Sequence, residues 1–98
     1  MPLKTSRFDA AAFLDTPEAI DAFLEDAFES SDPSFITHAL GVVARAKGMS
    51  QLAEETGLSR QALYKALSAD GRPEFSTVLK VAGALGFRLH PERAPEPV

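Results

Sequence analysis

The chain has no cysteine and no tryptophan among its 98 residues. Without cysteine, neither a disulfide framework nor a thiolate metal site can form. No apolar run approaches the roughly 20 residues that a membrane-spanning helix needs, and the N-terminus lacks the apolar core of a signal peptide. We therefore expect a cytoplasmic protein that does not contact membranes, and we expect it to need no cofactor.

Catalytic patterns are missing as well. The two histidines, His38 and His90, lie in no nucleophile or metal-binding pattern, and the sequence has no glycine-rich phosphate loop. Serine, histidine and aspartate all occur, but their order does not indicate a triad. A structural or surface role is the expected one for His38. The sequence favours a binding protein over an enzyme.

What the chain does contain is enough apolar sequence for one small core. Hydrophobic residues make up 45% of it, which suits a single domain over residues 1–90, followed by a disordered, proline-rich tail over 91–98. The net charge is −4, yet residues 59–88 carry five basic groups and only two acidic ones. Because a DNA footprint needs only a local positive surface, an acidic total does not exclude DNA binding.

Helical periodicity accounts for most of this domain. Thr16-Pro17 and Asp32-Pro33 each place a capping residue before a proline, which is typical of a helix start. The second helix is expected to end near Gly48 and a final helix at Gly86, while Phe87–Leu89 alternates like a short strand. Three apolar stripes are expected to face the core: Ile20, Phe23, Leu24, Ala27 and Phe28, then Phe35, Ile36, Ala39, Leu40 and Val43, and finally Phe75, Val78, Ala82 and Leu85.

Two further short helices joined by a tight turn are predicted within Met49–Leu67. Ser50 and Ser59 are the expected N-caps, and Gly57 can end the first helix in a left-handed conformation. The second helix should turn Leu63, Ala66 and Leu67 inward. The fold class is therefore all-α, a small bundle of about five helices that contains a helix-turn-helix and ends in a short strand.

The outward residues of the second motif helix match the chemistry of DNA. Arginine can fork onto guanine, glutamine can pair with adenine, and lysine can reach phosphates. We predict base contacts from Arg60, Gln61 and Tyr64. Phosphate contacts are predicted from neighbouring hydroxyl, amide and basic side chains, which are Ser50, Gln51, Ser59, Lys65 and Arg72. Because one such helix covers only a few base pairs, we expect a homodimer on palindromic double-stranded DNA.

An acidic N-terminal helical extension is expected over about residues 8–31. Its beginning, Phe8–Leu14, could be a short helix or an extended arm packed on the domain. Opposite the apolar stripe, the helix after Thr16 carries four acidic residues. They form either a solvated face or a docking surface for a basic partner protein. These residues are Asp21, Glu25, Asp26 and Glu29.

The motif, together with the segment after it, resembles the helix-turn-helix of phage-repressor-like regulators. Over Phe8–Leu89 the chain is more specifically similar to the probable addiction-module antidote family, relatives of HigA-type antitoxins. The most distinctive shared stretches are Leu63-Tyr64-Lys65-Ala66-Leu67 and Gly71-Arg72-Pro73. This resemblance implies a small antitoxin that binds a RelE/ParE-like toxin, often a ribonuclease, and represses its own operon as a dimer.

One position departs from the related repressors, which usually place a phosphate-gripping glutamine four residues before the motif alanine. Met49 stands at that place here, and Gln51 follows two residues later. Ser50 or Gln51 could supply the contact instead. Two alternatives stay open: a stand-alone regulator without a toxin partner, and a helical protein-interaction domain that has lost DNA binding.

Overall fold

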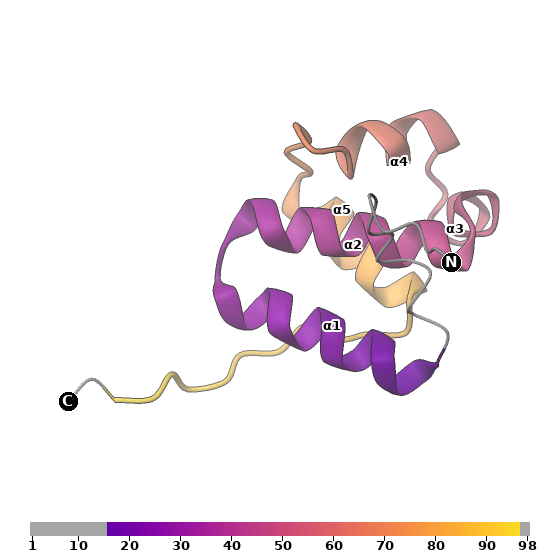
Figure 1. Cartoon of the computed structure of the whole chain (residues 1–98). Helices are drawn as coiled ribbons and strands as arrows, with labels where there is room; N and C mark the ends of the chain where they lie inside the picture. Colours follow the sequence, from indigo (N-terminus) through magenta and orange to yellow (C-terminus); the bar gives the residue numbers. More distant parts are fainter. Residues whose placement is uncertain (1–15, 97–98) are drawn as a thin grey trace, which may run out of the picture.

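The computed structural model describes residues 16–96, and within them the chain forms five helices and no strand (Figure 1). This arrangement confirms the all-α fold class. The helices are α1 (Pro17–Ser30), α2 (Pro33–Lys47), α3 (Met49–Thr56), α4 (Arg60–Ala66) and α5 (Phe75–Ala84). None of them has the length and apolar content needed to cross a membrane. Phe8–Leu14, with the first part of the expected extension, lies outside the described residues.

The starts of α1 and α2 follow the local signals in the sequence. The Thr16 hydroxyl oxygen accepts a hydrogen bond from the Ala19 amide at 3.1 Å, and an Asp32 carboxylate oxygen accepts one from the Ser34 amide at 3.0 Å. In both helices a proline follows the cap, at a position whose amide would have no helical partner. The two predicted starts are confirmed. Between them Ser31 takes a left-handed conformation with φ 57°, which reverses the chain.

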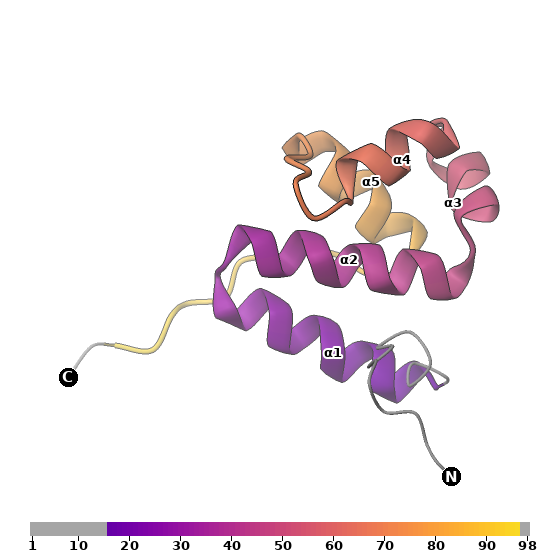
Figure 2. The same cartoon turned by 45° about the horizontal axis from the view of Figure 1, so that its top comes forward.

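α2 is the central helix of the bundle. It lies between α1 on one side and α3, α4 and α5 on the other (Figure 2). The largest fully buried side chains come one from each of α2 to α5, so the core joins all four helices. α1 adds Leu24 and Ala27 from its inner face. The four central side chains are Leu40, Leu52, Leu63 and Val81.

Two glycines allow close approach of the backbone around the end of α4. A Cβ atom on Gly41 would lie 2.8 Å from the carbonyl oxygen of Leu67, so α2 and the end of α4 meet at a distance that only glycine permits. A Cβ atom on Gly71 would overlap the carbonyl of Ala66. The loop after α4 therefore folds back tightly on that helix.

Two aromatic residues expected in the core are instead exposed. Phe35 is 37% exposed and Phe75 is 69% exposed, whereas the later residues of both stripes are buried or half-buried. Each stands in the first turn of its helix. A helical stripe is buried only where another part of the fold covers it, and the sequence pattern does not show which of its residues are covered. The prediction that both residues face the core was wrong.

The expected strand over Phe87–Leu89 is also absent. Gly86 ends α5 with φ 93°, as predicted, and its amide donates to the Gly83 carbonyl at 3.0 Å. The Phe87 amide then donates to the Ala82 carbonyl at 2.8 Å, which completes a Schellman cap. The backbone of Phe87 is thus used to close the helix, and residues 16–96 contain no strand with which the segment could pair. Pro91–Glu96 carry neither helix nor strand, and disorder of 91–98 stays a prediction.

Candidate nucleic-acid interface

The connection between α3 and α4 is the three-residue segment Gly57-Leu58-Ser59. Gly57 adopts φ 77° and ψ 8°, and its amide donates to the Ala53 carbonyl at 2.9 Å. A side chain at this φ would be strained, so the predicted role of Gly57 is confirmed. The Thr56 hydroxyl donates to the Leu52 carbonyl at 2.8 Å and accepts from the Leu58 amide at 3.2 Å. These bonds fix the turn on both sides of Gly57.

Ser59 begins α4 as predicted. Its hydroxyl oxygen accepts from the Ala62 amide at 2.9 Å, and its carbonyl accepts from the Leu63 amide at 3.0 Å. Since the hydroxyl accepts in this cap, its own proton remains available to donate to a phosphate. Ser59 is exposed at this position. The same side chain can therefore cap the helix and contact an anion.

The predicted cap of α3 was wrong. α3 begins at Met49 with Gly48 as its N-cap, at φ 119° and ψ 116°, and no side chain caps it. Ser50 is an exposed residue in the first turn. Met49 is 6% exposed, so its burial in the core accompanies a helix start two residues earlier than the capping pattern indicated. Gly48 supplies the chain reversal that this start requires.

The two faces of α4 are divided as the sequence predicted. Leu63 and Leu67 are buried and Ala66 is half-buried, which holds the helix on the core. The outward side chains are all exposed, and none of them forms an ion pair with an acidic residue within residues 16–96. They are Arg60, Gln61, Tyr64 and Lys65.

Arg60 and Tyr64 lie one helical turn apart and touch. The guanidinium carbon of Arg60 lies 5.7 Å from the centre of the Tyr64 ring, and an Arg60 nitrogen donates to the Tyr64 hydroxyl at 3.5 Å. This cation–π contact restrains the guanidinium above the first turn of α4. Arginine has five N–H donors, so most of them stay available for a ligand.

Gln51 takes part in a small polar network that the sequence did not reveal. Its amide nitrogen donates to a Glu55 carboxylate oxygen at 3.2 Å, and the other Glu55 oxygen lies 3.3 Å from the Lys47 ammonium. Lys47 also donates to the Ala84 carbonyl at 2.7 Å, which ties α3 to the ends of α2 and α5. Lys47 belongs to α2 and Glu55 to α3, so the periodicity of a single helix could not predict that they form an ion pair. One of the two Gln51 amide protons remains for a phosphate.

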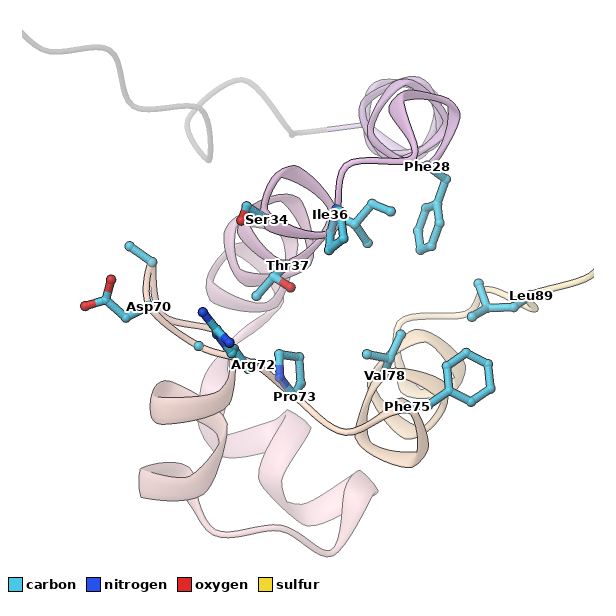
Figure 3. A pocket seen from close by; sticks show the side chains of 13 residues that line it. Phe28, Ser34, Ile36, Thr37, Asp70, Arg72, Pro73, Phe75, Val78 and Leu89 are labelled. Carbon is cyan, nitrogen blue, oxygen red and sulfur yellow. The ribbon is translucent and has the colours of Figure 1, made fainter.

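The remaining predicted site residues lie away from α4. Arg72 is exposed on the loop after α4, where it lines a groove with Thr37 and Pro73 (Figure 3). The acidic residues of α1 are exposed on the opposite side of α2 from α4 (Figure 2). These are Asp21, Glu25, Asp26 and Glu29. The residues of α4 predicted to contact DNA and the residues of α1 predicted to bind a partner therefore occupy different sides of the bundle.

Histidine and acidic residues form no metal-binding cluster within residues 16–96. His38 is exposed on α2, as a surface histidine would be. The ring of His90 lies 3.1 Å from the neighbouring Pro91 carbonyl.

Comparison with known proteins identifies the family. The family model described as "Probable addiction module antidote protein" matches residues 4–93. The chain belongs to this antidote family. An uncharacterized protein of Haemophilus influenzae is 41% identical to this chain over 87 residues, which cover 89% of this chain and 90% of the relative. No solved structure matches this chain significantly. Membership of an antidote family implies a toxin partner.

Proposed function

We propose that this protein is an antitoxin that neutralises a RelE/ParE-like toxin and represses its own operon by binding operator DNA as a homodimer. Its family supports the antitoxin part of the proposal. The observation that carries the DNA-binding part is the exposed face of α4. Gly57 ends α3 with a left-handed turn, and Ser59 caps the start of α4. This pair of helices is the helix-turn-helix of the proposal.

The first turn of α4 offers side chains suited to reading bases. Gln61 can pair with the N6 and N7 edge of adenine, and Arg60 can fork onto O6 and N7 of guanine. In a helix-turn-helix complex the N-terminal residues of the second helix are those that reach base edges. Tyr64 supports Arg60 from one turn below. Ser59 and Lys65 flank these residues and would hold phosphates.

The charge distribution supports separate surfaces for DNA and toxin. Five basic groups against two acidic ones in residues 59–88 accompany α4 and α5, although the whole chain has a net charge of −4. A ribonuclease toxin must present a basic surface to RNA, and the acidic face of α1 would attract such a surface. Complementary charge of this kind mainly speeds association and sets orientation.

Co-expression with the product of the neighbouring gene tests the antitoxin role. The proposal expects the two proteins to co-purify and the antidote protein to restore growth that the neighbouring product suppresses. Absence of both effects, together with binding to the protein's own promoter, would instead support a stand-alone regulator.

Binding to a promoter fragment and to a scrambled fragment, at low and at moderate salt, tests the DNA role. The proposal expects preference for the promoter at both salt concentrations, with weaker binding at the higher one because counterion release is then less favourable. If the protein binds its partner but binds neither DNA fragment at low salt, it is a protein-interaction domain. Its net charge of −4 would then explain the absence of DNA binding.

A further inference from the structure

A groove runs between the end of α1, the start of α2, the loop after α4 and the start of α5. Its volume is about 790 Å³. Figure 3 shows the side chains that line it. Apolar side chains from two regions far apart in the sequence line it, α1 with α2 and α5 with the segment after it, which makes it a surface created by the tertiary fold. These are Phe28 from α1, Ile36 from α2, Val78 from α5 and Leu89 from the C-terminal segment.

Phe75 stands at the edge of this groove and projects from it. It is 69% exposed, more than any other large hydrophobic side chain in the described part of the chain. Leaving so much of a phenyl ring in water forgoes a large share of the hydrophobic stabilisation that the residue could provide. A projecting aromatic beside a partly apolar hollow can be self-complementary, because a two-fold axis between two copies can bring each ring to the other copy's hollow.

The charges on the groove are self-complementary in the same sense. Asp70 and Arg72 both line it, and neither forms an ion pair within residues 16–96. In a two-fold arrangement, Arg72 of one copy would face Asp70 of the other, and the pair would occur twice. A stable interface buries about 800 Å² per partner, roughly a tenth of the 7175 Å² surface of this chain. The groove with its rim provides the centre of such a contact.

We propose that this groove is the homodimer interface, and that Phe75 of each copy enters the groove of the other. The consequence for DNA binding rests on the proposed function. Because the loop that carries Arg72 directly follows α4, the interface would set the distance between the two α4 helices and hence the spacing of the operator half-sites. Arg72 is then an interface residue, in place of the phosphate contact predicted from sequence.

Replacement of the projecting ring is the first test. In the full-length chain, Phe75→Ser should raise the dimer dissociation constant about tenfold or more, measured by sedimentation equilibrium of the protein alone. Phe35→Ser is the matched control, since Phe35 is also a partly exposed aromatic in the first turn of a helix but does not line the groove. It should change the constant less than about twofold. Both ring positions are exposed, and circular dichroism should show unchanged helix content.

Charge reversal is the second test. Arg72→Asp and Asp70→Arg should each weaken the dimer, because like charges would then face each other across the axis. The double variant should recover most of the loss, since it restores opposite charges. Weakening by both single variants without recovery in the double variant would overturn the symmetric pairing.

The remaining outcomes separate this inference from the proposed function. A dimer constant that Phe75→Ser leaves unchanged overturns the interface. If the same variant then loses capture of the toxin, the groove is a toxin site instead. Binding of Phe75→Ser to a single half-site fragment reports the DNA contact without dimerisation. If the wild type does not bind the half-site fragment, the proposed DNA-binding function is contradicted. The dimer interface is not contradicted by that result.

Discussion

On the exposed first turn of α4, Gln61 and Arg60 differ in how firmly they are held. Arg60 stacks on Tyr64, whereas no hydrogen bond within the described residues engages the Gln61 amide. Gln61 can therefore turn to a base edge without breaking an internal contact. Arg60 arrives with its guanidinium already restrained, which reduces the entropy lost on binding.

Replacing Gln61 by alanine should cost about 1–3 kcal/mol against the preferred operator and much less against random DNA, because a lost base contact removes discrimination. Titration of both DNAs with labelled duplexes measures the difference. Lys65→Ala is the control, since loss of a phosphate contact weakens both DNAs alike. Equal losses on both DNAs for Gln61→Ala would show that Gln61 only positions the backbone.

Gly41 provides a second test at a single residue, this time of stability. A Cβ atom there would lie 2.8 Å from the Leu67 carbonyl oxygen, and backbone atoms cannot easily move away. Gly41→Ala should therefore lower the free energy of unfolding by about 1–3 kcal/mol, as overpacking usually does. Urea denaturation followed by circular dichroism measures the change.

Gly83→Ala is the matched control for this substitution. Gly83 also lies within a helix, and a Cβ atom there would meet nothing within 4 Å. Alanine should stabilise α5 by roughly 0.5–1 kcal/mol, because glycine loses more backbone entropy in a helix. Equal effects of the two substitutions would show that α2 and the end of α4 are not tightly packed at Gly41.

At the scale of elements, α4 has only seven residues, too few for a helix that is stable by itself. Its cap, its buried leucines and its contact with α3 hold it in place. α1 is twice as long, with 14 residues, and contributes only one face to the core. Its other face is free for a different task, which is why the acidic residues of α1 and the exposed residues of α4 can act independently.

Reversing Asp21, Glu25 and Glu29 to lysine should slow association with the toxin and change dissociation less. The physical reason is that rim charges act mainly on encounter, and salt screens them over about 8–10 Å. Association rates of wild type and variant, measured by surface capture at two salt concentrations, provide the comparison. DNA binding should not fall in the variant, because these residues lie across α2 from α4. Indistinguishable rates at low salt would show that these acidic residues form only a solvated face.

At the scale of the whole molecule, one copy presents one exposed α4 face, which covers only a few base pairs. We therefore expect a dimer on a palindrome with half-sites one helical turn, or a multiple of it, apart. Footprinting on operators with altered spacing measures this. Inserting half a turn between the half-sites should abolish the tight complex, since the second α4 would face the wrong side of the DNA. One undivided footprint from a monomer would contradict the expectation.

The starts of α1, α2 and α4 and the ends of α3 and α5 were determined by the sequence alone, because capping is local. Thr16, Asp32 and Ser59 bond to amides two or three residues ahead, and Gly57 and Gly86 supply the left-handed turns that follow a helix. Such bonds need no distant partner. The division of α4 into an inner and an outer face was equally predictable, since helical spacing by itself separates them.

Burial was decided only by the tertiary structure, since it depends on neighbours distant in sequence. Phe35 and Phe75 continue the apolar stripes of their helices, yet both side chains are exposed. Phe75 stands beside a groove that parts of α1, α2, the loop after α4 and α5 form together. Burial of Met49 moved the start of α3 away from Ser50, although the serine carried the better cap. Local hydrogen bonds place the ends of helices, whereas packing between helices decides which side chains are left exposed to bind a partner.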